Sequence, residues 1–144
     1  MIRNKKGFTL VELLAVIVIL GILLTLGVGA YSKFILKSKG KTFTISENSL
    51  KDAAESAMDN CRGMIGKSGI CNTHSLNKIT TSDKIYLPEL VRYSFIDNIK
   101  NPYNGDDFCS SSSYVKITPA DSQGIEYNYE VCLICGDHRS DGCE

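Results

Sequence analysis

The sequence predicts an α+β fold in which a long N-terminal helix is followed by a small antiparallel β-sheet. Three patterns support this: an uncharged apolar run near the N-terminus, a helical apolar stripe after it, and alternating apolar and polar residues near the C-terminus. The length of 144 residues corresponds to one domain and argues against a multidomain enzyme. Basic and acidic residues number 16 each, so the chain lacks the net positive charge typical of nucleic-acid-binding proteins.

A basic leader, residues 1–7, precedes the apolar run. Within 13–32, 20 consecutive residues carry no charge. At about 1.5 Å per residue, a helix of this length covers the ~30 Å hydrocarbon core of a membrane. We therefore expect residues 8–32 to form one membrane-spanning helix. The competing interpretation is a secretory signal peptide cleaved after Ala30, although the run is longer than the apolar core of such peptides and begins with the acidic Glu12.

Residues 33–60 are expected to continue as an amphipathic helix. Four lysines follow the apolar run directly, so its two flanks carry similar numbers of basic residues and charge alone leaves the orientation open. Apolar and small residues then recur at steps of three and four, the spacing of one helix face. They are Phe43, Ser46, Leu50, Ala53, Ala54 and Ala57. Because no proline occurs within 8–60, we expect one helix of 53 residues, with Gly27, Gly29 and Gly40 as the points where it can bend or fray.

Residues 61–144 are rich in turn-forming residues and are predicted to form a small globular domain. A proline at the start of an apolar stripe predicts a short helix over 87–96. A turn is predicted at 101–106. Alternation at 114–118 and 125–133 predicts the two strands of a β-hairpin. The apolar face of this hairpin needs a partner, which the amphipathic half of the long helix supplies.

Six cysteines in so short a chain predict disulfides, provided that the domain lies in an oxidising compartment. Six cysteines permit fifteen pairings, so spacing alone does not determine the connectivity. Proximity along the chain favours the pairs Cys61–Cys71 and Cys135–Cys143. This leaves Cys109 to pair with Cys132.

The register of the predicted hairpin conflicts with the last of these pairs. Aligning the apolar faces places Ile117 opposite Ile125. This register does not bring Cys109 opposite Cys132. Either a bulge before the strand corrects the alignment, or Cys109 pairs with Cys135 instead.

No catalytic set emerges from the sequence. Spacing alone allows a zinc site of three thiolates and an imidazole, at Cys132, Cys135, His138 and Cys143. An even number of cysteines outside the cytoplasm favours disulfides over this zinc site. We expect His74 and His138 at the surface, and Asn104 in a solvated turn rather than in a calcium site. The chain is therefore expected to be no enzyme and to hold no metal or cofactor.

The N-terminal residues 7–12 read G-F-T-L-V-E and lead directly into the apolar run. Together with the basic leader, this segment resembles the class III signal of type IV pilins and type II secretion pseudopilins, over roughly residues 1–35. The resemblance implies that prepilin peptidase cleaves after Gly7 and methylates the new amine of Phe8. It also implies a single-pass precursor in the cytoplasmic membrane with the C-terminal domain outside, and a mature form in a cell-surface pilus or pseudopilus.

The resemblance further implies a structural subunit whose partners are other pilin subunits, prepilin peptidase, the membrane and the assembly platform. Glu12 is the assembly residue that it implies. A buried, unpaired carboxylate is unfavourable, and cleavage creates a cationic amine at Phe8, one helical turn away. The chain has Gly29 where many family members have proline, which bears on filament geometry. The alternative function is a membrane-anchored minor pilin that binds a surface, DNA or a secretion substrate.

Overall fold

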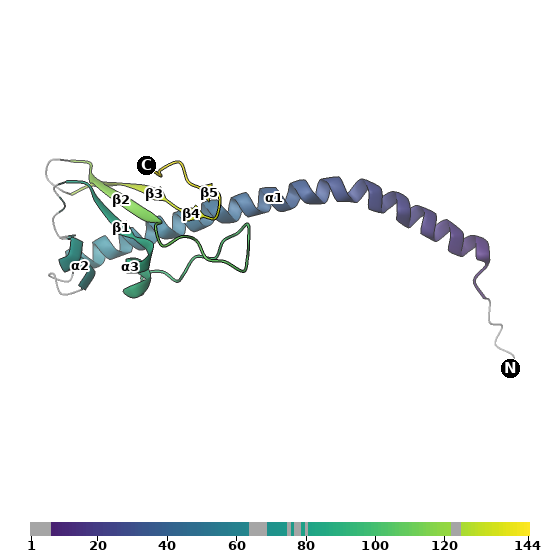
Figure 1. Ribbon diagram of the computed structural model, residues 1–144, viewed down its shortest axis with the longest axis horizontal. Coiled ribbons are helices and arrows are strands. Elements are labelled where there is room, and N and C mark those ends of the chain that lie inside the picture. The colour runs from purple at the N-terminus through teal and green to yellow at the C-terminus, as the bar shows by residue number, and fades with distance from the viewer. Residues whose placement is uncertain (1–6, 64–68, 75, 77–78, 80, 122–124) are drawn as a thin grey trace, which may run out of the picture. The chain divides into compact units, whose positions relative to one another are not determined.

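The structure is a computed structural model, and its first element is the helix α1 (Leu10–Gly63). The residues described are 7–63, 69–74, 76, 79, 81–121 and 125–144, with the backbone alone at 26–28. The single long helix expected from the absence of proline is confirmed. The chain divides into two compact units, Met1–Ser38 and Lys39–Glu144, and α1 contributes to both. Figure 1 shows the remaining elements gathered around the C-terminal part of α1.

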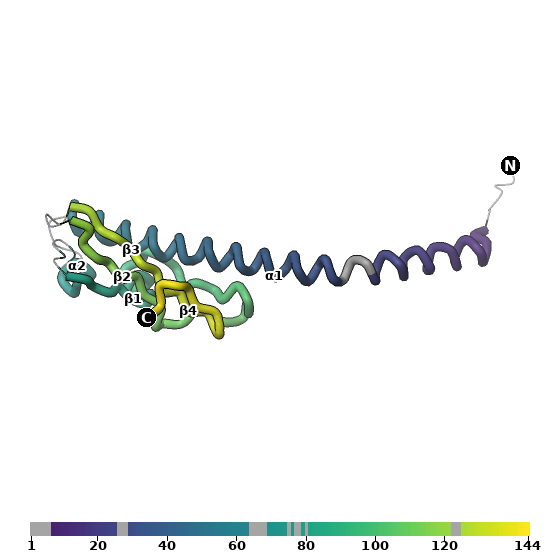
Figure 2. Tube along the Cα trace, turned by 90° about the horizontal axis from the view of Figure 1, so that it is seen from above, coloured from purple at the N-terminus to yellow at the C-terminus, as the bar shows by residue number. Residues whose placement is uncertain are grey.

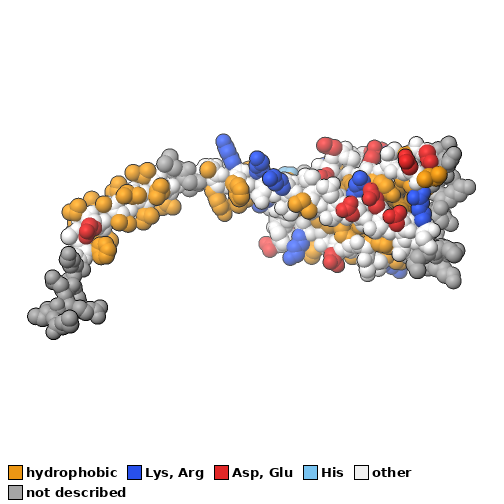
Figure 3. Space-filling model, turned by 180° about the vertical axis from the view of Figure 1, so that it is seen from behind, with side chains coloured by type: hydrophobic (Ala, Val, Ile, Leu, Met, Phe, Trp, Pro, Cys, Tyr) orange, Lys and Arg blue, Asp and Glu red, His pale blue; other side chains and the backbone are white. Residues whose placement is uncertain are grey.

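The first unit contains the N-terminal part of α1, whose apolar side chains face outward all round the helix. The large apolar side chains from Phe8 to Leu24 are 49–88% exposed. Figure 3 shows apolar side chains covering this segment. Among the described residues, no single helix combines the length and apolarity of a membrane span. Two consecutive parts of α1, Leu10–Thr25 and Gly29–Gly63, meet that criterion only when they are taken together as one bent span.

In the second unit, the predicted helical stripe forms one wall of the hydrophobic core. The stripe residues that are at most 9% exposed are Phe43, Leu50, Ala53, Ala54 and Ala57. Burial of a side chain such as that of Leu50 stabilises the fold by about 1.5–3 kcal/mol. Lys51 and Glu55 form an ion pair one turn apart, with Nζ 3.4 Å from Oε1. The amphipathic pattern thus predicted the buried face correctly.

Three antiparallel strands complete the core: β1 (Asp83–Tyr86), β2 (Tyr114–Pro119) and β3 (Tyr127–Cys132), in the spatial order β1-β2-β3. Figures 1 and 2 both show this sheet beside the part of α1 that belongs to the second unit. Val115 and Ile117 of the central strand are fully buried and belong to the same core cluster as the α1 stripe. The predicted hairpin is confirmed as β2 and β3, whereas β1 is an addition that the sequence patterns did not predict.

The register of the hairpin differs from the predicted one. Ile117 pairs with Tyr129 rather than with Ile125. Ile125 lies before β3 and is 60% exposed. Its backbone N–H donates to Oδ1 of Asp121 at 2.8 Å, so Ile125 belongs to the turn and not to the strand.

The short helix α3 (Leu87–Arg92) begins at the predicted residue but ends earlier than expected. Ser94 adopts a left-handed conformation with φ of 62°. The N–H of Phe95 donates to the carbonyl of Leu90 at 2.9 Å, and the N–H of Ser94 donates to that of Val91 at 3.0 Å. This is the Schellman type of helix ending, which satisfies carbonyl groups of the last turn.

Three further short elements were not predicted: α2 (Gly69–His74), β4 (Ile134–Cys135) and β5 (His138–Arg139). The strands β4 and β5 form a tight antiparallel hairpin. Gly136, the first residue of its two-residue turn, has φ of 63°, a conformation that glycine adopts without strain.

Candidate processing and assembly site

The chain enters α1 through a short non-helical segment, residues 7–9. Phe8 is 88% exposed, and open space surrounds Gly7. The peptide bond between these two residues therefore lies outside the helix. Proteases cleave preferentially at exposed backbone that is free of regular structure, and this bond has those properties.

Thr9 and Glu12 form a capping box at the first turn of α1. Oε2 of Glu12 accepts hydrogen bonds from the backbone N–H of Thr9 at 2.9 Å and from its hydroxyl at 3.0 Å. The backbone N–H of Glu12 donates in turn to Oγ1 of Thr9 at 3.3 Å. A threonine followed three residues later by a glutamate is the sequence signature of this motif. Glu12 was predicted from the sequence and Thr9 was not, although both residues of this signature are visible there.

The carboxylate of Glu12 keeps part of its capacity to bind a cation. Within the described residues, its hydrogen bonds involve Oε2, and none is made by Oε1. An ionised carboxylate offers about four acceptor positions over its two oxygens. A cationic group can therefore approach Oε1 while Thr9 holds Oε2. The negative charge also lies at the positive end of the helix dipole, which favours its ionised form.

All six cysteines form disulfides. The bridges are Cys61–Cys71, Cys109–Cys135 and Cys132–Cys143. The first bridge is the pair that proximity favours. The other two bridges show that the predicted pairs Cys135–Cys143 and Cys109–Cys132 are wrong. Cys109 lies beside Cys135 because the backbone N–H of Ser110 donates to the carbonyl of Ile134 at 2.6 Å. This hydrogen bond aligns the neighbouring cysteines. The observed pair Cys109–Cys135 is the alternative that the conflict with the predicted register left open.

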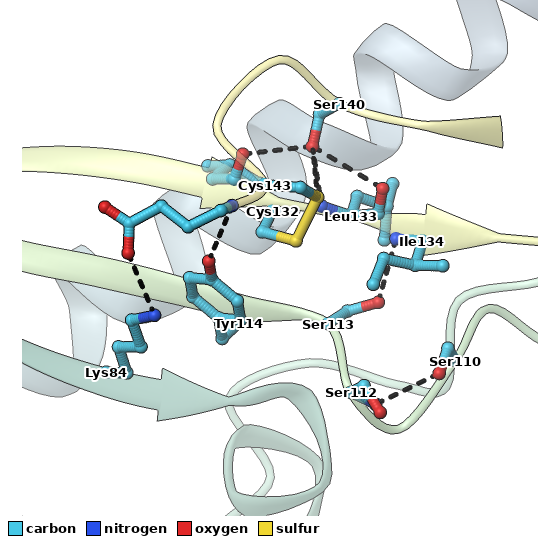
Figure 4. The surroundings of a disulfide bond; sticks show 12 residues. Lys84, Ser110, Ser112, Ser113, Tyr114, Cys132, Leu133, Ile134, Ser140 and Cys143 are labelled. Carbon is cyan, nitrogen blue, oxygen red and sulfur yellow. Dashed lines mark hydrogen bonds and ion pairs between the residues drawn. A yellow bond between two sulfur atoms is a disulfide. The ribbon is translucent and has the colours of Figure 1, made fainter.

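Figure 4 shows the surroundings of the Cys132–Cys143 bridge. Ser140 connects the end of β3 to the loop that carries Cys143. Its hydroxyl group accepts a hydrogen bond from the backbone N–H of Leu133 at 2.6 Å and donates one to the backbone carbonyl of Val131 at 3.0 Å. These hydrogen bonds hold the loop against the end of β3, so Cys143 pairs with Cys132.

No cluster of three or more metal-binding side chains occurs among the described residues. The cysteines of the zinc-like spacing are all in disulfides, and the exposed ring of His138 stacks on Tyr103 with centroids 3.5 Å apart. Asn104 lies in the predicted turn. Its Nδ2 donates to Oδ2 of Asp107 at 2.6 Å, and its carbonyl accepts the Asp107 N–H at 3.2 Å.

His74 corrects a prediction, because it does not lie at the surface. Its side chain is 11% exposed and lies between two carboxylates. Nδ1 is 3.0 Å from Oδ2 of Asp83, and Nε2 is 2.9 Å from Oε1 of Glu89. The carboxylates are 9 and 15 positions away along the chain, so no local spacing rule connects them with the histidine.

Comparison with known protein families finds one match, over residues 2–28, to the prokaryotic N-terminal methylation motif. No solved structure matches the chain. The matched segment contains the exposed Gly7–Phe8 bond, the Thr9–Glu12 capping box and most of the apolar part of α1. The long N-terminal helix followed by a three-stranded antiparallel sheet is a pilin-like α+β architecture. The chain thus carries the class III signal of type IV pilins and pseudopilins.

Proposed function

We propose that this protein is a structural subunit of a type IV pilus or pseudopilus. Prepilin peptidase cleaves the precursor after Gly7 and methylates Phe8, and the mature chain then assembles through the N-terminal part of α1. The methylation motif at residues 2–28 supports the processing step. Its partners in this function are other pilin subunits, prepilin peptidase and the assembly platform of the membrane.

The observation that carries the proposal is the exposed apolar surface of α1 from Leu10 to Leu24, with one acidic residue, Glu12, at its start. A helix that is apolar all round is stable in lipid or among other helices. Packing against the same segment of other subunits lets it leave the bilayer without exposing this surface to water. Glu12 is the only charged residue on the described part of α1 before Lys33.

Cleavage supplies the partner for Glu12. The new amine of Phe8 is a cation, and in a low-dielectric bundle it is attracted strongly to a carboxylate. Thr9 already binds one oxygen of Glu12, which favours pairing of the other oxygen with the amine of a neighbouring subunit. We propose that this contact sets the position of one subunit against the next.

The proposed location follows from the same features. The precursor is a single-pass protein of the cytoplasmic membrane, its basic leader is cytoplasmic and its disulfide-bonded domain is external. Three disulfides are consistent with an oxidising compartment outside the cytoplasm.

Mass spectrometry of the protein recovered from the cell surface tests the proposal. We expect a mature chain of 137 residues that begins with N-methylated Phe8. Gly7→Leu is the matched control, because it adds a bulky side chain beside the cleaved bond and leaves α1 unchanged; we expect uncleaved precursor from it. A mature protein that begins at Tyr31 would instead show an ordinary secretory signal peptide. Abundance in sheared filaments, compared with membranes, separates a filament subunit from a membrane-anchored binding module.

A further inference from the structure

The ring of His74 lies between two carboxylates that come from different elements. His74 is the last residue of α2, Asp83 begins β1, and Glu89 lies in the first turn of α3. The carboxylate oxygens are 3.0 Å from Nδ1 and 2.9 Å from Nε2. The side chain of His74 is 11% exposed, and those of Asp83 and Glu89 are about one third exposed, at 34% and 31%. The histidine thus connects three elements in the second unit.

Backbone groups fix both carboxylates in place. The second oxygen of Asp83, Oδ1, accepts the backbone N–H of Lys84 at 2.8 Å. The second oxygen of Glu89, Oε2, accepts the backbone N–H of Tyr86 at 3.0 Å. Each carboxylate therefore presents its remaining oxygen to the ring as a hydrogen-bond acceptor.

Two acceptors require two donors from one imidazole ring. A neutral imidazole has one N–H group and one nitrogen lone pair, so it satisfies only one of the carboxylates and repels the other. The imidazolium ion has an N–H on each nitrogen and satisfies both. With both carboxylates ionised, the two contacts are therefore satisfied together only when the ring is protonated.

We propose that His74 is a proton-dependent clamp, which in its imidazolium form holds the C-terminal end of α2 against β1 and α3 and which loosens when it loses its proton. One contact then becomes a repulsion between a lone pair and a carboxylate, and the attraction between the ring and two negative charges is lost. Ile70 and Cys71 stay buried in the core, and the Cys61–Cys71 bridge joins α2 to α1, so the loosening is confined to the end of α2 that carries His74.

The charged groups around the ring agree with this direction. Burial lowers the pKa of His74, but the hydrogen bonds and negative charges of Glu89 and Asp83 outweigh it and leave the pKa raised above its usual value. The cations of the adjoining elements are turned to other partners: Lys84 pairs with Glu144, Arg92 lies over Tyr93, and Arg62 of α1 lies over Tyr127.

The sign of the pH dependence follows from linkage. Because the pKa is higher in the folded than in the unfolded chain, the clamp contributes its full stability below the unfolded value of about 6.5. This contribution is lost as the pH rises through the folded-state pKa. We therefore expect the end of α2 to be held more firmly in acid than in alkali.

A histidine titration by NMR of the full-length chain in detergent micelles provides the first test. The chain has two histidines, so their ring signals are readily assigned with one substitution. We expect His74 to titrate above the ordinary histidine value of about 6.5. In Glu89→Gln and Asp83→Asn, each of which removes one negative charge and keeps an oxygen acceptor, the midpoint of His74 is expected to fall. A His74 midpoint at or below about 6.5, or one that neither substitution moves, would refute the clamp.

Hydrogen exchange of the peptide that contains α2 provides the second test. After correction for intrinsic exchange, we expect its protection to fall by about tenfold for each unit of pKa elevation between about pH 5 and pH 9. His74→Gln is expected to remove this pH dependence, and the matched control His138→Gln is expected to retain it. If the wild type and His74→Gln lose protection in α2 equally with rising pH, the clamp is wrong.

Discussion

Thr9 and Glu12 hold each other at the first turn of α1, each accepting a hydrogen bond from the backbone N–H of the other. The acidic side chain that we assign to assembly is therefore already positioned within its own chain. One residue thus has two roles that can be separated by experiment: it caps a helix, and it carries a charge.

Glu12→Gln is predicted to block filament assembly while leaving the helix cap intact. Glutamine fits the same position of a capping box, so it keeps the hydrogen bond to Thr9 but removes the charge that attracts the amine of Phe8. Sheared filaments are expected to contain little of this variant, and the membrane fraction most of it. Normal assembly of Glu12→Gln would show that the charge is unnecessary.

Thr9→Ala is the complementary variant. It removes the hydroxyl but keeps the charge of Glu12, and loss of a threonine cap costs about 0.5–2 kcal/mol. We expect reduced helicity at the start of α1 in micelles, measured by exchange of the first amides, with assembly retained. Complete loss of assembly in this variant would show that assembly depends mainly on the helix cap and not on the charge of Glu12.

The disulfide connectivity predicts an order of stability losses. Replacing both cysteines of a bridge by serine is expected to cost about 2–5 kcal/mol in the free energy of unfolding. The Cys109–Cys135 bridge spans 26 residues and the Cys132–Cys143 bridge spans 11, so loop-closure entropy makes the loss larger for the first by about 0.8 kcal/mol. Urea unfolding under non-reducing conditions measures both. Peptide mapping that finds Cys109 joined to Cys132 would contradict the structure.

Two positions in left-handed conformations predict opposite changes in stability. Ser94→Gly is expected to stabilise the domain by about 0.5–1 kcal/mol, because a residue with a Cβ is strained there. Gly136→Ala is expected to destabilise it by about 1–2 kcal/mol, since it introduces the same strain and brings a Cβ to 3.3 Å from Nδ2 of Asn101. Thermal unfolding should therefore shift upward for the first and downward for the second.

Glu144 predicts a pH dependence opposite to that of His74. Hydrogen bonds from Lys116 and Lys84, followed by their charges, lower the pKa of Glu144. Its contribution to stability is therefore present above the unfolded pKa and is lost as the pH falls through the folded one. The Glu144 side chain is 61% exposed, so the effect should be small and weakened by salt. Comparison of Glu144→Gln with wild type in acid, at low and high salt, measures it.

The register of the hairpin shows where sequence patterns stop being informative. Alternation determines which face of a strand is buried, and a shift by an even number of residues leaves that face unchanged. The predicted partner of Ile117, Ile125, and the observed one, Tyr129, differ by such a shift. The backbone N–H of Ile125 donates to Asp121 in the turn, and β3 begins only at Tyr127, two residues later than predicted.

Features within one element and the packing of the hairpin on α1 were predictable, whereas most other contacts between distant segments were not. The buried stripe of α1 followed from spacing, because 3.6 residues per turn places Leu50 and Ala54 on one face. The strand β1 pairs with β2 across about 30 residues. Likewise, the environment of His74 depends on how α2, β1 and α3 fold together, which no pattern within any one of them specifies.

The bridge between Cys61 in the last turns of α1 and Cys71 in α2 has a mechanical consequence. The bridge adds a covalent cross-link between two helices that the backbone already joins, and it shortens the loop that a pulling force could extend between them. Reduction would leave packed side chains as the only direct attachment of α2 to α1. In the fibre that we propose, resistance of the globular part to stretching would therefore depend on the redox state of its surroundings.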